Sequence, residues 1–430
     1  MTEKNSKRSI INREWFAIDN AGKIFPGQNS AKWSNAFRLT FSMNETIDPA
    51  LMQRALERVL PRFPCYAVKL RHGFFWYYFE KNEKSAPEVK KDINNICYRF
   101  KYSENDRFLF RVFYHEKKIS VEFFHAISDA YGCSRLMSTM VAEYLRLKGY
   151  DIPCGGAVLD INQSASESEL RDPFLHYCSS KVKAPRPKMN VYHFKAKKLP
   201  MHTVNLTIGY LPVDKLLQEA RKYNSTLTEY VAATLVYIHY KVQKEKERRQ
   251  KDISAQIPVN LRRTYNSDTL RNFSMCYCYR MNPNMGEYTF EEILRQLSLY
   301  LRFINNEKQL NAMMAANTSI EKNPILRALP LFIKKAGMSI SFMITGERST
   351  STAFSNFGKL DVPPEMAAHI EKAALFMGPG LLNGARVGGI SFGNTMALAF
   401  SNCYEDRTIE REFFRELVKR GIPVKIEANS

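Results

Sequence analysis

One histidine at the end of an apolar run is the residue of this chain best suited to chemistry. The run 119–124 leads into His125, and Asp129 follows four residues later, just before Gly132. A histidine with a pKa near neutrality can act as a general base, and an aspartate close by can orient a loop without reacting. The alternative is a histidine satisfied at the edge of a core, because His-x-x-x-Asp spacings also arise by chance.

Four segments of the chain resemble one known family, and they occur in the family's order. Residues 14–26 look like the opening signature of bacterial alcohol acetyltransferase-like proteins, and His125–Gly132 resembles the HHxxxDG motif of the chloramphenicol acetyltransferase and condensation-domain superfamily. Residues 258–262 and 354–358 resemble the third and fourth segments. Together they cover nearly the whole chain. Two positions depart from the motif, because Phe124 replaces its first histidine and Ala130 replaces the glycine after Asp129.

The resemblance implies an α/β (α+β) fold of two chloramphenicol acetyltransferase-like lobes. Each lobe is expected to be a mixed β-sheet flanked by helices, with a tunnel between the lobes. The implied activity is transfer of an acetyl or other acyl group from a coenzyme A thioester, or an acyl carrier protein, to an alcohol. His125 would be the general base, with no acyl-enzyme and no permanently bound cofactor. The alternative is a non-catalytic relative that binds an acyl carrier or a synthase partner.

The resemblance also assigns roles around the catalytic loop. Asp129 is expected to point away from the substrates and to pair with an arginine across the lobes, for which Arg262 is our choice. For Arg262 and its neighbour Arg263 the alternative is a solvated loop. Gly132 is expected to be structural, near the same loop.

Three further residues could take part in the chemistry or serve only in the fold. Ser355 or Asn356 could donate to an oxyanion or bind substrate. For Asn356 the alternative is a turn residue before a glycine. Cys133 lies eight residues after the histidine, and we expect it to pack on the following helix instead of acting as a nucleophile.

The formal net charge of +20 narrows the class of partner. Such a charge favours an acidic partner: nucleic acid, an anionic membrane face, or a polyphosphorylated thioester or acidic carrier protein. No zinc-finger spacing or RNA-recognition signature accompanies the charge, so we expect no specific nucleic acid. Contact with the surface of a membrane is a further alternative for the acidic partner.

The composition predicts a globular, cytoplasmic protein. Hydrophobic residues make up 45% of the chain and aromatic residues 12%, which excludes a disordered chain. No run of about 18 apolar residues predicts a membrane span, and no signal peptide is expected. The eight cysteines are irregularly spaced, as is typical of reduced cytosolic thiols. We expect Cys276 and Cys278 to be core thiols, and no metal site.

The secondary-structure pattern predicts a lobe over 1–150, a crossover over 151–200 and a second lobe over 201–430. Helices are expected from Pro49 with Asp48 as cap, over 133–148, from Val213, and over 406–419. Thr226 and Thr289 each begin a capping box before a further helix. Strands are expected at 65–70, 74–79, 108–114, 119–124, 203–208, 339–344, 388–393 and 396–401.

Overall fold

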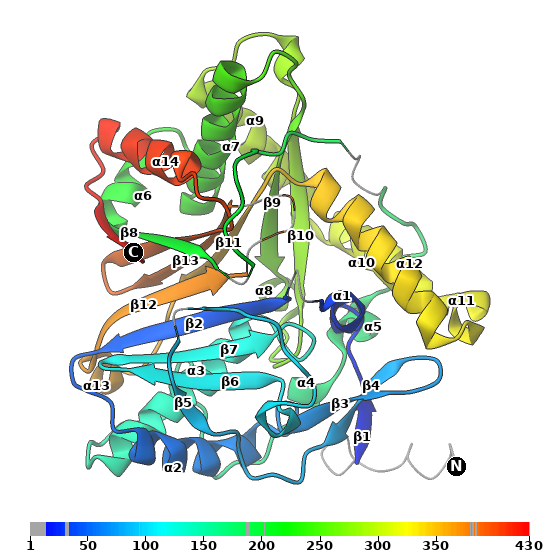
Figure 1. Cartoon of the computed structure of the whole chain (residues 1–430), viewed down its shortest axis with the longest axis vertical. Coiled ribbons are helices and arrows are strands. Elements are labelled where there is room, and N and C mark those ends of the chain that lie inside the picture. Colours follow the sequence, from blue (N-terminus) through cyan, green and yellow to red (C-terminus); the bar gives the residue numbers. More distant parts are fainter. Residues whose placement is uncertain are drawn as a thin grey trace.

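The computed structural model describes residues 14–30, 34–93, 95–185, 190–201, 203–378, 380, 382 and 385–429 of the chain. Its strands form sheets of five, seven and three strands. The two larger sheets build two lobes, each with helices against it, and the lobes meet where β12 lies against β13 and β14 (Figure 1).

The N-terminal lobe is built on the five-stranded sheet, in the order β12-β2-β7-β6-β5. All neighbours run antiparallel except β5, which is parallel to β6. Helices α2 (Pro49–Val59) and α3 (Ala130–Leu147) pack on each other, and α3 also lies against β2 and β7. The strands are β2 (Ala36–Met43), β5 (Val89–Lys91), β6 (Phe110–His115), β7 (Lys118–Phe124) and β12 (Ile370–Met377).

The C-terminal lobe is built on the seven-stranded sheet, in the order β10-β9-β11-β13-β14-β8-β15. This sheet is mixed, because β11 runs parallel to both β9 and β13. Helices α7 (Leu227–Lys246), α9 (Phe290–Ile304) and α14 (Thr408–Lys419) cover its outer side. The strands are β8 (Asn205–Pro212), β9 (Ile253–Asn260), β10 (Ser274–Met281), β11 (Thr352–Lys359), β13 (Ala385–Phe392), β14 (Thr395–Asn402) and β15 (Lys425–Ala428).

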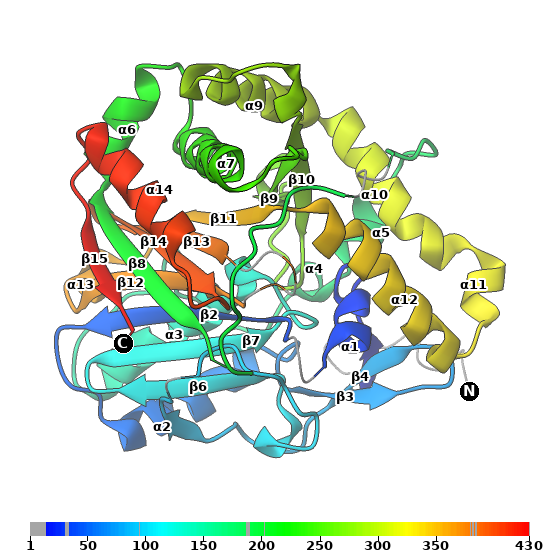
Figure 2. The same ribbon diagram turned by 45° about the horizontal axis from the view of Figure 1, so that its top comes forward.

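A small sheet and several short helices complete the structure at one edge (Figure 2). The sheet has the order β1-β4-β3, with β1 (Trp15–Ala17), β3 (Val68–His72) and β4 (Tyr77–Lys81). The remaining helices are α1 (Phe25–Gln28), α4 (Glu167–Leu170), α5 (Pro173–Tyr177), α6 (Val213–Arg221), α8 (Arg262–Tyr265), α10 (Glu307–Lys322), α11 (Pro324–Ala328), α12 (Leu331–Thr345) and α13 (Pro364–Ala367).

Helix starts follow their local caps. The Asp48 side chain accepts from the first backbone N–H groups of α2, and the capping boxes at Thr226 and Thr289 both form. The helix predicted from residue 133 begins earlier, at Ala130, and ends as expected before Gly149, whose φ is +97°. In each case the side chain or glycine satisfies backbone groups that the helix itself leaves open.

One predicted strand is wrong. Residues 339–344 belong to helix α12. Residues 339–344 alternate polar and apolar side chains at their start, as a strand does, but so short a segment does not distinguish a strand from a helix. The helix begins at Leu331, and its 15 continuous residues are much longer than an ordinary strand.

The two lobes share a strand. Strand β12 comes from the C-terminal half of the chain but forms the edge of the N-terminal sheet, where Ala374 pairs with Thr40 of β2. The division at 1–150, 151–200 and 201–430 stays a prediction. In the topology, residues 370–377 pair with the first lobe.

Candidate active site

His125 lies in the turn directly after β7, with its imidazole between two phenylalanine rings. The ring of Phe25 on α1 stacks on it at a centroid distance of 4.5 Å and an interplanar angle of 17°. Phe37 on β2 meets it edge-on at 5.1 Å. Burial in this apolar setting lowers the pKa of His125 below its ordinary value of 6.5. The imidazole is therefore neutral at pH 7.

Asn272, in the loop before β10, holds the ring of His125. Its Oδ1 lies 3.0 Å from Nδ1 of His125, and its Nδ2 donates to the His125 carbonyl oxygen at 3.0 Å. Nδ2 also faces the two carboxylate oxygens of Asp19, at 3.3 and 3.2 Å. A carbonyl oxygen and an ionised carboxylate only accept hydrogen bonds. The amide is therefore oriented with Nδ2 toward Asp19 and Oδ1 toward the imidazole.

This orientation selects one tautomer of His125. Because Oδ1 of Asn272 has no proton to give, Nδ1 of His125 must carry a hydrogen and donate it. The lone pair of the neutral ring is then on Nε2. A general base needs such a lone pair in a fixed direction.

Asp19 is buried, and a backbone N–H group and a guanidinium group contact its carboxylate. The backbone N–H of Gly22 donates to its Oδ1 at 2.6 Å, and Nε of Arg271 lies 3.5 Å from its Oδ2. Burial raises the pKa of Asp19 to about 6, although the Arg271 cation acts in the opposite direction. At pH 7 the carboxylate is mostly ionised. No role was predicted for Asp19 or Asn272 from the sequence, although Asp19 lies within the first family-like segment.

Asp129 and Arg262 form a buried ion pair that joins the two lobes. Nη1 and Nη2 of Arg262 donate to Oδ2 and Oδ1 of Asp129 at 2.9 and 3.0 Å. Oδ2 also accepts from the Phe273 backbone and the Ser274 hydroxyl. Burial alone would raise the pKa of Asp129, but the Arg262 guanidinium and these hydrogen bonds hold it below its ordinary value of 3.8. The neighbouring Arg263 is exposed.

Gly132 lies in the first turn of α3, where no side chain fits. A Cβ there would overlap the Ser128 hydroxyl, the Tyr66 hydroxyl and the Leu270 carbonyl oxygen. Both hydroxyls donate to the Leu270 carbonyl oxygen, at 2.6 and 2.7 Å, and so link the N-terminal lobe to the loop before β10. Ala130, which stands where the family motif has glycine, is the first residue of α3. The space restriction therefore falls on Gly132, two residues later.

Ser355 and Asn356 lie on β11 and face opposite sides of the sheet, as neighbours on a strand do. Ser355 pairs with Gly388, where a Cβ would overlap the backbone of β12, so Ser355 faces the N-terminal lobe. Asn356 points to α7 instead. Its Nδ2 donates to the Thr228 hydroxyl at 2.9 Å, and its Oδ1 accepts from the Gly358 N–H at 3.0 Å. The Asn356 amide is thus bound to the irregular end of β11 and to the start of α7.

The cysteines divide between core and surface. Cys133 is buried in α3, and burial raises the pKa of its thiol well above the ordinary value of 9.0. The prediction of core thiols is wrong for Cys276, which is exposed, because Met275 and Tyr277 occupy the core side of β10. Within the described residues, no group of three His, Cys, Asp or Glu side chains is placed to hold a metal ion.

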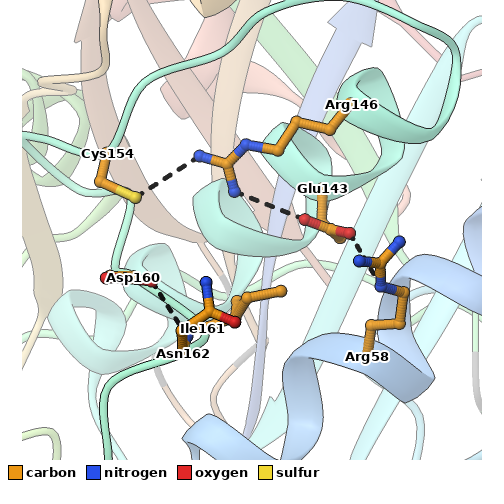
Figure 3. Close-up of a pocket in the computed structure, with 7 residues that line it drawn as sticks. All are labelled: Arg58, Glu143, Arg146, Cys154, Asp160, Ile161 and Asn162. Carbon is orange, nitrogen blue, oxygen red and sulfur yellow. Dashed lines mark hydrogen bonds and ion pairs between the residues drawn. The ribbon is translucent and has the colours of Figure 1, made fainter.

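A separate hollow lies near the C-terminal end of α3, between α2 and residues 154–162 (Figure 3). The carboxylate of Glu143 lies there between Nε of Arg58 at 3.0 Å and Nη1 of Arg146 at 3.4 Å. A carboxylate held between two guanidinium groups forms charge-assisted hydrogen bonds to both of them, so we interpret this cluster as structural. Cys154, Asp160, Ile161 and Asn162 complete the lining.

Known structures match the chain over nearly its whole length, although no protein-family model and no curated protein sequence matches it. TRI101 of F. graminearum, complexed with coenzyme A and deoxynivalenol, has a TM-score of 0.65 at 11% identity and covers 96% of this chain and 99% of its own. Polyketide synthase associated protein 5 from Mycobacterium tuberculosis has a TM-score of 0.57 at 13% identity, with 94% and 96% covered.

A condensation domain gives a third match. A variant of the starter condensation domain of rhizomide synthetase RzmA, in complex with C8-CoA and Leu-SNAC, has a TM-score of 0.54 at 14% identity, with 94% and 93% covered. The chain therefore has the same two-lobed α/β fold as these proteins, and the predicted fold class is confirmed.

Proposed function

We propose that this protein is an acyltransferase that moves an acetyl or other acyl group from a coenzyme A thioester to an alcohol. The observation that carries the proposal is the neutral His125, whose Nδ1 is bound to Asn272 so that Nε2 holds the lone pair. The fold is consistent with it, because the acetyltransferase TRI101 is complexed with coenzyme A and the RzmA domain with C8-CoA.

The proposed reaction is direct transfer. Nε2 of His125 takes the hydroxyl proton of the alcohol while the alcohol oxygen forms a bond to the thioester carbonyl carbon. The tetrahedral intermediate collapses with cleavage of the carbon–sulfur bond, and the imidazolium returns the proton to the coenzyme A sulfur. General base catalysis increases the rate of such reactions about 10²–10⁴-fold, and holding both substrates in line increases the rate further.

The other residues have supporting roles in this proposal. The Asp129–Arg262 pair fixes the loop that carries His125 and takes no proton. Ser355, on the sheet face toward the N-terminal lobe, remains the candidate donor to the oxyanion. Cys133 is no nucleophile, because its buried thiol stays protonated at neutral pH.

The test is release of the coenzyme A thiol from acetyl- and longer acyl-coenzyme A in the presence of a panel of alcohols. We expect thiol release that depends on the alcohol, with formation of the matching ester. Double-reciprocal plots should intersect, since both substrates meet in a ternary complex. Parallel lines with a trapped acylated protein would mean a covalent intermediate, and Cys133 would be examined first.

One further outcome separates the acyltransferase from the non-catalytic alternative. No thiol release with any acyl donor and alcohol, together with binding of an acyl carrier protein, would favour the non-catalytic alternative.

If the charge of +20 attracts the donor's phosphates, the apparent KM for coenzyme A thioesters rises with salt, because screening acts over about 8 Å at physiological ionic strength.

A further inference from the structure

Helix α12 turns its apolar side outward. Phe332 is 73% exposed and Ile340 61% exposed, whereas Lys334 between them is buried. Nζ of Lys334 donates to the Phe75 carbonyl oxygen at 3.0 Å and lies 4.0 Å from the centre of the Trp76 ring. A helix on the surface of a globular protein usually shows the reverse arrangement, with its apolar side against the core.

The tip of the β3–β4 hairpin adds aromatic rings beside this helix. Phe74 is 72% exposed, and its carbonyl oxygen accepts from the Leu331 N–H at 2.9 Å, which fastens the hairpin to the start of α12. Figures 1 and 2 show α11, α12 and the hairpin together at one edge of the molecule. We call the exposed apolar residues there the apolar edge: Phe74, Phe75, Ile325, Phe332, Ile333 and Ile340.

Cations accompany the apolar edge, and the nearest acidic residues in the sequence are Glu321 and Glu347, on either side of it. Residues 322–346 contain two lysines at 334 and 335, Lys322 and Arg327, and no aspartate or glutamate. Lys322, Arg327 and Lys335 are exposed. Exposed apolar groups that gather in one place, unlike scattered single ones, mark an interaction surface, and the cations require that its partner be anionic.

The length of α12 decides how such a surface can meet a membrane. Its 15 residues extend about 22 Å at 1.5 Å per residue, less than the roughly 30 Å of a bilayer's hydrocarbon core. Throughout the described part of the chain, no helix is both long and apolar enough to cross a membrane. A short helix with an apolar side and a cationic rim lies in the plane of the interface, about 5–10 Å deep.

We propose that the apolar edge binds the surface of an anionic phospholipid bilayer. The phenylalanine and isoleucine side chains enter the headgroup and acyl boundary, and the exposed cations contact lipid phosphates. A second copy of this chain fits less well, because it would set the same positive rim against itself. An anionic bilayer supplies both an apolar layer and the opposite charge.

The test is sedimentation of the full chain with vesicles of phosphatidylcholine, with and without phosphatidylglycerol. We expect binding that requires phosphatidylglycerol and weakens with salt. The double variant Phe74→Ser/Phe332→Ser should lower the partition coefficient about tenfold or more, and Lys335→Glu about fivefold or more, since each cation near the surface contributes about 1 kcal/mol. Circular dichroism should show that both variants are folded.

The matched control is Phe303→Ser on α9, a ring that is 68% exposed but outside the apolar edge, and it should bind vesicles like the wild type. Equal binding by the control and the double variant would overturn the proposal, as would no binding to any vesicle. A dimer in light scattering that Phe332→Ser dissociates would assign the apolar edge to a second copy instead.

Discussion

Nδ1 of His125 lies 3.0 Å from Oδ1 of Asn272, whose Nδ2 faces the carboxylate of Asp19. Three side chains from distant parts of the sequence thus form one hydrogen-bonded series. Each member fixes the next: the carboxylate orients the amide, and the amide sets the tautomer of the imidazole. Asn272 is therefore a positioning residue, whose effect on the proposed reaction passes through His125.

Replacing Asn272 should change the pH profile as well as the rate. Asn272→Ala leaves Nδ1 without its acceptor, and turnover should fall about 10–10²-fold, a part of the general base contribution, with KM little changed. Asn272→Asp places a carboxylate beside the ring, raises the pKa of His125, and should move the acid limb of the pH–rate profile upward. The measurement is kcat and kcat/KM from pH 5 to 9. Profiles of unchanged shape in both variants would reduce Asn272 to a packing role.

His125→Ala should abolish most turnover and spare the fold. We expect a loss of about 10²–10⁴-fold in kcat, because the proton acceptor is gone, and a Tm close to that of the wild type. His115→Ala, at the exposed end of β6, is the matched control and should keep full activity. Equal activity in the two variants would end the assignment of His125 as base.

The Asp129–Arg262 pair should show strong coupling. Asp129→Ala and Arg262→Ala should each destabilise the protein by about 3–5 kcal/mol, since each leaves the other charge buried and unpaired. The double variant should lose less than the sum. Urea unfolding of the two single variants and the double variant measures this, with Arg263→Ala as the exposed control. Strictly additive losses would contradict the coupling.

Asp19 should make folding stability depend on pH in an unusual direction. Its pKa is raised from 3.8 to about 6 in the folded state, so between these values the folded protein binds more protons than the unfolded chain. The contribution of Asp19 is then fully present below about 3.8 and is lost as the pH rises through about 6. The measurement is the free energy of unfolding of the wild type and of Asp19→Asn over pH 4–7. The difference between the two proteins gives the pH-dependent contribution of Asp19. A difference that does not change with pH would refute the shift.

Gly132→Ala should destabilise the protein by about 1–3 kcal/mol, as overpacking does in a dense core. The new methyl group has to displace the Leu270 backbone or two hydroxyls. Ala130→Gly, two residues earlier, is the control and should change stability by about 1 kcal/mol or less near a helix start. Thermal unfolding compares them, and a larger loss for Ala130→Gly would reverse the assignment.

Local signals predicted much of the secondary structure, because caps act within one turn. Thr226 and Glu229 bind each other's backbone N–H groups, and the Asp48 side chain accepts from the Ala50 and Leu51 N–H groups at the start of α2. Residues 339–344 were predicted as a strand because Ser339 and Ser341 alternate with apolar residues, and so short a segment does not show the period of a helix. Only its continuity with Leu331 and packing against α1 decide for a helix.

The site was predicted only where a motif marked it. His125 and Asp129 lie in one short segment, but Asn272 is 147 residues from its partner and lies in a loop. Its amide has no spacing or periodicity that points to a histidine. Contacts over such separations follow from how β7 and β10 are placed by two different sheets, which no local pattern specifies.

The strand that the two lobes share also orders events during synthesis. Until Ile370–Met377 leaves the ribosome, β2 is an open edge with unpaired backbone N–H and C=O groups beside the buried core of the first lobe. Such edges recruit other strands and promote aggregation. The N-terminal sheet therefore reaches its full width only after about seven-eighths of the 430 residues have been translated, and we expect a nascent chain stalled before that point to bind chaperones.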